Sequence, residues 1–421
     1  MTDDTPIDPS TDAEPPTRRG YLSTSAALLA GGLLAGCAND GNRTERSTDG
    51  AASDGTETPT DTPTAEPTAT ATDAPDSTAT ETPQGTQSGV ETPYSVSIEP
   101  VGEVTFDAVP ETWVANNGSW ADMGIALGLE PPKGVWLTGR YHTDYYDSIP
   151  GVSVDKSDMV SLYQDGVSKE LFYELDADVH VMDPNFLQNR FKGWEQSDVD
   201  EVATEIAPLF GNCIYAQHYP WHSDYRYYTL MEGFEKLAQV FQRTDRYEAF
   251  EAVHDDFQSN LAPVVPNQGE RPEVAVLWGV GNEPDQFYPY IIGDGTGFKH
   301  LRDLEVRDAL ASTDIKDFHG SRAAIDLETL LKVDPEVLML RGYEAMSADE
   351  FGNTVVSFLE DHQTASALTA VENGDVYRAG GLYQGPITSL VLTERTAKQL
   401  YGADAELFDR ERVAEIVNGD L

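Results

Sequence analysis

The side chains best suited to chemistry are aromatic residues and two arginines in loops that follow expected strands. The aromatic residues are Trp120, Tyr141, Tyr163, Trp221, Trp278, Phe287, Tyr288, Tyr290, Tyr343 and Tyr383. The arginines, Arg140 and Arg341, hold similar loop positions in the two halves of the sequence. Rings and tyrosine hydroxyls suit a ligand with flat apolar faces and acceptor oxygens, and a guanidinium can hold anionic oxygens. We therefore predict a ligand-binding cleft. The alternative for each ring is core packing, and for each arginine a surface ion pair.

Direct capture of a metal ion is another use for the polar residues. The possible ligands are His142, Asp144, His218, His222, Asp294 and His319. Neutral imidazole together with carboxylate suits zinc or manganese. No pair has a diagnostic spacing such as His-Glu-x-x-His, so the sequence favours no metal site. Cys213 is expected to be a small buried hydrophobe.

Motifs for enzymatic catalysis are absent from the sequence. It has neither a Gly-x-Ser-x-Gly nucleophile elbow nor a Gly-x-x-x-x-Gly-Lys-Ser/Thr phosphate loop. Residues 293–297 are glycine-rich, but they follow an aromatic loop rather than a clean strand. We expect a protein that is not an enzyme and has no cofactor, with a surface hydrolase as the least favoured alternative.

An internal repeat provides elements that must position the candidate residues. Residues 168–182 align with residues 326–340, and each segment indicates a short helix, a tight turn and a buried strand. Glu170 and Glu328 fall in the first turn of the two helices, where the helix dipole favours an exposed carboxylate. The alternative to a functional role is that each glutamate only stabilises its own helix.

Strands and helices alternate around this repeat. Strands are expected over residues 112–115 and 273–280, with a helix starting at Trp120. Such alternation is typical of α/β lobes with parallel sheets. Ligands of these sheets collect at the carboxyl ends of the strands, which is where the aromatic loops lie.

A long helix is expected to connect the two halves. Apolar residues recur at helical spacing from Leu230 to Leu261, over a length that could reach about 48 Å, and residues 244–246 are a possible interruption. The predicted fold is α/β, with two lobes that have mainly parallel central sheets and are joined by one long helix. The expected boundaries are 94–222 for the first lobe, 223–262 for the connecting helix and 263–421 for the second lobe.

The first 37 residues are typical of an export signal. Arg18 and Arg19 form a twin-arginine pair ahead of an apolar stretch over residues 22–36, which is shorter than the roughly 20 residues of a membrane-spanning helix. The stretch ends in Leu-Ala-Gly-Cys, which is similar to a lipobox, so Cys37 is the expected lipidation site. The alternative is a short buried helix.

Residues 38–93 consist mainly of Thr, Pro, Ala, Asp, Glu, Ser and Gly. Such a composition cannot form a core and predicts a disordered stalk that holds the globular part away from the membrane. Residues 42–44 form an acceptor pattern for glycosylation that is common by chance.

The net charge excludes some classes of partner. Asp and Glu number 73 against 27 Lys and Arg, which gives a formal charge of −46. Nucleic acids and anionic lipid surfaces would be repelled. The acid excess resembles proteins of extreme halophiles, whose carboxylate-rich surfaces stay hydrated in concentrated salt, although an ordinary acidic protein is the alternative.

The chain from about residue 97 to 421 resembles the ABC-importer binding proteins for iron-siderophores and cobalamin, in which a single long helix joins two lobes. The resemblance rests on the repeated helix–strand units, on residues 371–381 and on residues 394–401, which look like the last strand and helix of that family.

The resemblance implies a lipid-anchored protein on the outer face of the cytoplasmic membrane that captures a ferric siderophore. It would deliver the siderophore as a monomer to a permease dimer with its ATPase subunits. It further implies that Glu170 and Glu328 dock onto arginines of the permease. Cobalamin and haem remain alternative ligands.

Overall fold

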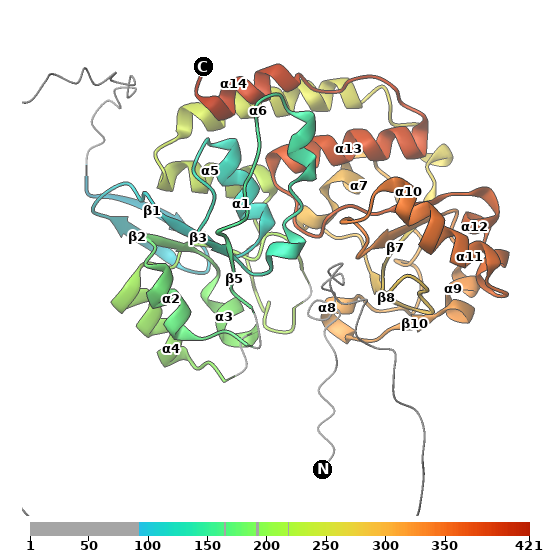
Figure 1. Cartoon of the computed structure of the whole chain (residues 1–421), viewed down its shortest axis with the longest axis horizontal. Helices are drawn as coiled ribbons and strands as arrows, with labels where there is room; N and C mark the ends of the chain where they lie inside the picture. Colours follow the sequence, from blue (N-terminus) through green and yellow to red (C-terminus); the bar gives the residue numbers. More distant parts are fainter. Residues whose placement is uncertain (1–91, 164–165, 191–192, 218) are drawn as a thin grey trace, which may run out of the picture. The chain divides into compact units, whose positions relative to one another are not determined.

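The computed structural model describes residues 92–163, 166–190, 193–217 and 219–421, which alternate strands with helices as predicted (Figure 1). The predicted signal peptide, including Cys37, and nearly all of the predicted stalk lie outside the described residues. Within the described ranges, no helix is both long and apolar enough to cross a membrane.

The first half of the described chain contains three two-stranded sheets. The strands are β1 (Tyr94–Ile98), β2 (Gly102–Phe106), β3 (Trp113–Ala115), β4 (Gly134–Val135), β5 (Val160–Ser161) and β6 (Val179–Val181). β1 and β2 form an antiparallel hairpin, whereas β3 pairs in parallel with β6, and β4 with β5. Every residue of β3 and β6 is buried, as expected for parallel strands covered on both faces.

The second half forms one six-stranded mixed sheet. Its strands are β7 (Glu273–Gly279), β8 (Gln286–Tyr290), β9 (Arg307–Asp308), β10 (Ile325–Asp326), β11 (Val337–Arg341) and β12 (Val376–Arg378). The order is β10-β8-β7-β11-β12, and β9 also pairs with β7. β7, β11 and β12 are parallel, whereas β8 is antiparallel to both of its neighbours. The predicted closing strand is thus β12, at the edge of this sheet.

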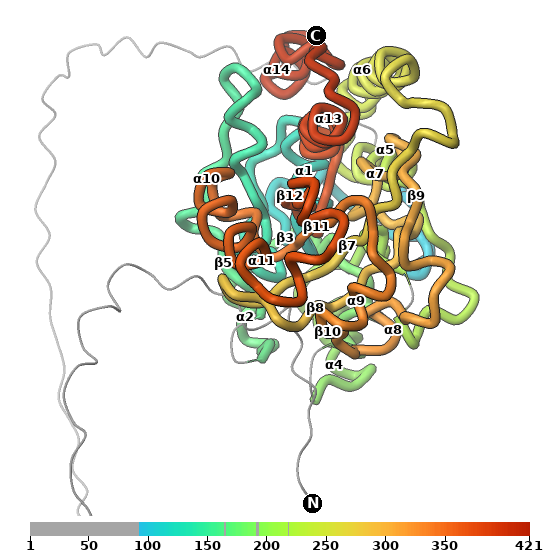
Figure 2. Tube along the Cα trace, turned by 90° about the vertical axis from the view of Figure 1, so that its right-hand side faces the viewer, coloured from blue at the N-terminus to red at the C-terminus, as the bar shows by residue number. Residues whose placement is uncertain are grey.

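Helices surround the sheets (Figure 1). They are α1 (Gly118–Ala126), α2 (Lys169–Leu175), α3 (Pro184–Arg190), α4 (Gln196–Glu201), α5 (Leu230–Val240), α6 (Thr244–Leu261), α7 (Lys299–Asp303), α8 (Phe318–Ser321), α9 (Leu327–Val333), α10 (Ala348–Phe351), α11 (Ser357–Asp361), α12 (Thr369–Asn373), α13 (Pro386–Tyr401) and α14 (Arg410–Asn418). Figures 1 and 2 show α6, α13 and α14 together at one end and α4 and α8 toward the other.

The connection between the halves consists of two helices, α5 and α6, and the break between them at residues 241–243 lies directly before the possible interruption that the sequence indicated at residues 244–246. The helices are separated because Gln242 adopts a φ of 51°, which an α-helix cannot accommodate. α6 has 18 residues and therefore spans roughly 27 Å. The apolar spacing runs through both helices because they pack on each other, with the rings of Phe234 and Phe250 meeting edge to face at 5.7 Å.

The internal repeat is confirmed in three dimensions. α2 and α9 are each seven residues long and each is capped at the N-terminus by a side chain, from Ser168 and Asp326 respectively. Each helix ends at an aspartate in the left-handed region, Asp176 with φ 42° and Asp334 with φ 50°. The buried strands β6 and β11 follow, so both copies form the same helix–turn–strand unit.

The repeat also sets the pairing of the central strands. Asp178, just before β6, accepts a hydrogen bond from the amide of Thr112, just before β3, at 2.7 Å. Glu336, just before β11, accepts one from the amide of Glu273 at the start of β7, also at 2.7 Å. In each copy, the carboxylate that precedes the strand of the repeat, β6 or β11, therefore fixes where the neighbouring parallel strand, β3 or β7, begins.

Candidate ligand-binding site

Side chains from both halves line a common pocket, which we call the aromatic pocket. Its lining consists of Trp136, Arg140, Phe186, Arg190, Tyr215, Tyr219, Tyr290, Phe318, His319, Arg322, Leu382 and Tyr383. Trp136 directly follows β4, and Leu382 comes shortly after β12. The pocket thus lies where the rule for α/β sheets places a ligand, at the carboxyl ends of strands.

A chain of aromatic rings crosses this pocket from one half to the other. The ring of Trp136 meets that of Phe186 at 5.0 Å and an interplanar angle of 81°. Phe186 contacts Tyr215 at 6.4 Å, and Tyr215 contacts Tyr383 of the second half at 5.1 Å and 81°. Edge-to-face packing exposes ring edges and faces of different polarity, which suits a ligand with flat apolar and oxygen-rich surfaces.

The aromatic pocket has a basic lining, formed by Arg140, Arg190 and Arg322, in a strongly acidic protein. The guanidinium carbon of Arg140 lies 4.7 Å from the ring centroid of Trp278, and that of Arg322 lies 4.7 Å from the ring of Phe318. Among the described residues of the lining none is acidic. A guanidinium stacks on rings through its face and binds anionic oxygens through the fork of donors on its edge.

His319 adds an imidazole to the wall of the aromatic pocket. Its Nδ1 lies 3.1 Å from Oδ1 of Asp317, the residue whose side chain also caps α8. Burial lowers the pKa of His319, although the carboxylate of Asp317 opposes that shift. The imidazole is therefore held in one orientation and favours its neutral form near pH 7.

The aromatic pocket is narrow in this conformation. Its free volume is about 20 Å³, which is room for about one water molecule, whereas sites for drug-sized ligands have roughly 300–1,000 Å³. A ligand of that size can therefore enter only if pocket side chains or the two halves move apart.

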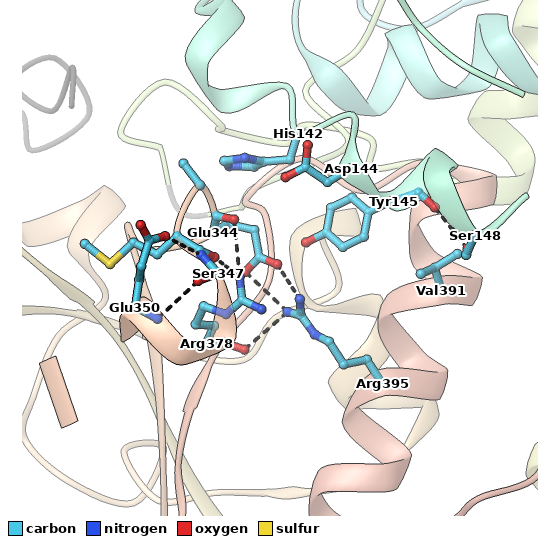
Figure 3. A pocket seen from close by; sticks show the side chains of 12 residues that line it. His142, Asp144, Tyr145, Ser148, Glu344, Ser347, Glu350, Arg378, Val391 and Arg395 are labelled. Carbon is cyan, nitrogen blue, oxygen red and sulfur yellow. Dashed lines mark hydrogen bonds and ion pairs between the residues drawn. The ribbon is translucent and has the colours of Figure 1, made fainter. Parts of the chain in front are cut away.

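A second and larger pocket, which we call the charged pocket, has a volume of about 530 Å³ (Figure 3). Glu344 lies there between the guanidinium groups of Arg378 and Arg395, with His142 and Asp144 on the opposite wall. Arg395 donates to both carboxylate oxygens of Glu344. Because this pair satisfies its own charges, and because only His142 and Tyr145 contribute rings among the described lining residues, the aromatic pocket is the better candidate site despite its smaller volume.

The structure brings four of the sequence-predicted binding residues to the aromatic pocket. Arg140, Tyr290 and Tyr383 line it, and Trp278 supports Arg140 by stacking. Arg140 belongs to a short 3-10 helix after β4, whereas Arg341 ends β11. The two arginines are therefore not equivalent, and the residue that matches Arg341 in the first copy of the repeat is Asp183.

Five other predicted residues belong to the core and do not line the aromatic pocket; these are Trp120, Tyr141, Phe287, Arg341 and Tyr343. The rings are buried by packing, and their polar atoms are engaged internally, as where the hydroxyl of Tyr343 donates to Gly281 O at 2.8 Å. Arg341 donates to Gly297 O and stacks against Phe298 at 4.4 Å. Burial lowers its pKa to about 10, which still leaves it charged at neutral pH.

Three predicted rings form a second layer around the aromatic pocket. Trp221 stacks on the pocket residue Tyr219 at 4.2 Å, and Tyr163 packs against Trp136 at 4.9 Å. Tyr288 meets Phe318 at 5.0 Å. They support residues that line the pocket.

Sequence reasoning missed several lining residues, among them Phe186, Arg190, Tyr215 and Arg322. Phe186 and Arg190 share one face of α3, four residues apart, and α3 follows β6 directly. That spacing after a predicted strand is a usable signal. Arg322 follows the last residue of α8 in a left-handed conformation, and the sequence does not indicate that conformation or the position of this side chain in the pocket.

The two repeat glutamates occupy equivalent, exposed positions. Glu170 and Glu328 are each the second residue of their helix. Hydrogen bonds from its own backbone amide and from Ser168 lower the pKa of Glu170, so it is ionised at neutral pH. Each half therefore presents one exposed carboxylate at the same position of its repeat helix, α2 or α9.

Comparison with known proteins identifies the family. The sequence model of the periplasmic binding proteins matches residues 118–381, which is more than half of the chain. The fold is similar to a periplasmic binding protein from Veillonella parvula, at 15% identity and a TM-score of 0.51, with 75% of this chain and 100% of that chain covered. It is also similar to the iron-uptake ABC transporter substrate-binding protein PiuA from Streptococcus pneumoniae, at 18% identity and a TM-score of 0.51, with 74% and 100% covered. No curated protein sequence matches the chain.

The chain therefore belongs to the periplasmic binding protein family, and the family resemblance expected from its sequence is confirmed. Members of this family are transport components that bind a solute, and they act outside the cytoplasm in association with an ABC permease and its ATPase.

Proposed function

We propose that this protein is the lipid-anchored substrate-binding component of an ABC importer that captures a ferric siderophore at the cell surface. The observation that carries the proposal is the aromatic pocket, in which Arg140, Arg190 and Arg322 accompany a chain of rings. Guanidinium groups suit the anionic oxygens that hold iron, and the rings suit the organic body of the chelate. The expectation of iron itself comes from the sequence resemblance.

Absorption spectroscopy and mass spectrometry of the molecule that copurifies with the native protein would identify the ligand. We expect a visible absorption band of a ferric chelate and a matching mass, together with quenching of tryptophan fluorescence when the stripped protein is titrated with that chelate. A corrinoid or haem spectrum would redirect the proposal to those ligands. Import of free zinc or manganese into cells by this system, with no organic chelate bound to the protein, would refute it.

Substitution of the pocket arginines tests whether the aromatic pocket is the site that binds the ligand. Arg140→Ala and Arg322→Ala should each weaken chelate binding about tenfold or more, because each removes a desolvated donor to an anionic ligand. Arg412→Ala is the matched control, since Arg412 is a surface residue that pairs with Glu415 on α14. Equal affinities for all of these proteins would exclude the aromatic pocket as the site.

The repeat glutamates are proposed to dock onto basic residues of the permease. Glu170→Arg combined with Glu328→Arg should abolish uptake while chelate affinity stays within twofold of the wild type, because both residues lie on the surface away from the aromatic pocket. Glu411→Arg is a suitable control, as Glu411 is also an exposed first-turn acid, on α14. Loss of uptake in the control, or parallel loss of affinity in the double variant, would contradict docking.

A further inference from the structure

Three side chains of metal-binding type converge in the first half, outside the lining of the aromatic pocket. A carboxylate oxygen of Asp183, the sulfur of Cys213 and a ring nitrogen of His222 all lie within 4.8 Å of one another. Asp183 and Cys213 are almost fully buried, and His222 is partly buried. Carboxylate, thiolate and imidazole are the ligand types that zinc takes in proteins. We propose that these three residues bind a divalent ion of the zinc type, with water in the remaining tetrahedral position.

The imidazole of His222 is oriented as a metal ligand requires. Its Nδ1 lies 2.6 Å from the hydroxyl of Tyr227, and its ring stacks on Tyr225 at 4.1 Å and 13°. Ligating histidines generally use one ring nitrogen for a supporting hydrogen bond and the other for the metal. With Nδ1 directed at Tyr227, Nε2 is the nitrogen for the ion.

One tyrosine positions the other two ligands. The hydroxyl of Tyr225 donates to Oδ2 of Asp183 at 2.5 Å and accepts from the amide of Cys213 at 2.7 Å. The amide of Asn185 donates to Oδ1 of Asp183 at 2.8 Å. The carboxylate of Asp183 and the backbone of Cys213 are therefore held by surrounding hydrogen bonds, which is the part that outer groups play in metal sites.

Metal binding at this cluster would be coupled to proton release. The thiol of Cys213 would lose its proton to solvent as the metal–sulfur bond forms, so binding should strengthen as pH rises.

The location gives such an ion a structural consequence. Residues between the bridge at Leu209 and the start of α5 contain no helix or strand in their described part. This connection carries Tyr215 and Tyr219, whose hydroxyls lie 2.7 Å apart in the wall of the aromatic pocket. Irregular connections of this length are uncommon in compact domains, and they are usually either functional or disordered. An ion that joins Cys213 and His222 to Asp183 would hold these tyrosines in place.

Cobalt titration tests the site directly. We would use the full-length chain with Cys37→Ser, which leaves Cys213 as the one thiol in the sequence. After removal of bound metal by a chelator, Co²⁺ should produce a thiolate-to-cobalt absorption band in the near ultraviolet that saturates at one equivalent and is displaced by Zn²⁺. Further substitution of Cys213→Ser should abolish the band, and His222→Gln or Asp183→Asn should weaken cobalt binding at least tenfold.

A control and a second measurement keep the test decisive. His254→Gln changes a histidine on α6, outside the cluster, and should leave the titration unchanged. Zn²⁺ should raise the melting temperature of the Cys37→Ser protein but not of the Cys213→Ser protein, and circular dichroism would show that both are folded. Cobalt binding without a thiolate band, a band that persists after Cys213→Ser, or no shift in melting temperature would overturn the proposal.

Discussion

Asp122 on α1 accepts hydrogen bonds from both the amide and the hydroxyl of Thr388, a residue in the first turn of α13 that is 266 positions further along the chain, at 3.0 and 3.1 Å. The same oxygen accepts from the amide of Ile387 at 3.0 Å, and the other oxygen accepts from Tyr146 at 2.6 Å. A Cβ atom on Gly385 would lie 2.4 Å from this carboxylate. A fully buried aspartate of the first half thus caps the long helix that follows the last strand of the second half.

Replacement of Asp122 should reveal this cap. Asp122→Ala leaves buried amides of α13 without an acceptor and should lower the free energy of unfolding by about 3 kcal/mol. Burial, opposed by hydrogen bonds from Tyr146 and Thr388, raises the pKa of Asp122 to about 6. The contribution of this group to stability is therefore largest below its unfolded pKa of 3.8 and declines as pH rises toward 6. Asp122→Asn, which is neutral and keeps an acceptor, should cost less than Asp122→Ala at pH 7 in urea titrations. Equal losses would show that the capping bonds do not matter.

The ion pair of Glu344 with Arg395 should govern stability in acid. Burial raises the pKa of Glu344, but the attraction and hydrogen bonds of Arg395 outweigh it and lower that pKa to about 2. The pair therefore contributes fully above the ordinary pKa of 4.5, and its contribution is lost as pH falls from 4.5 toward 2. Glu344→Gln should lower the free energy of unfolding by about 3 kcal/mol at pH 7 and flatten its dependence on pH below 4.5.

The control for this prediction is an exposed ion pair. Glu415→Gln removes the partner of Arg412 on α14, and a surface pair is worth at most about 1 kcal/mol. If the two variants lose the same stability, or if the acid branch of the Glu344→Gln protein matches that of the wild type, the buried pair does not have this role.

The repeat and the order of strands and helices were predictable because they depend on local patterns. The helix, turn and strand of each copy follow from apolar spacing and from turn residues such as Asp176 and Asp334, and the structure preserves all of them. The break between α5 and α6 was predicted only as a possible interruption at residues 244–246 and lies directly before them, because Gln242 carries no sign of its left-handed conformation. Nothing local separates Tyr383, which lines the aromatic pocket, from Tyr141, whose hydroxyl meets that of Tyr146 in the core at 2.7 Å. That distinction depends on tertiary packing.

Salt should stabilise the protein, because its excess Asp and Glu side chains, with a formal net charge of −46 over the whole chain, repel one another when the chain is compact. The Debye length falls from about 10 Å at 0.1 M to about 3 Å at 1 M salt. The melting temperature should therefore rise by roughly 10 °C or more between 0.1 and 2 M NaCl, as expected for the proposed adaptation to concentrated salt, and KCl should have an equal effect. A melting temperature that is constant over this range would show that the acidic surface is not a halophilic adaptation.

The proposed lipid anchor can be tested through the two cysteines of the chain. Cys37 follows the small residues of the predicted lipobox, whereas Cys213 is buried in the first half. Cys37→Ser should move the protein from the membrane fraction to the medium, because the remaining sequence offers no other lipidation site of this kind and its charge disfavours anionic lipid surfaces. Cys213→Ser is the matched control and should leave the protein with the membrane. Fractionation followed by mass spectrometry of the amino-terminal peptide would check both outcomes, and membrane retention of the Cys37→Ser protein would mean that the anchor lies elsewhere.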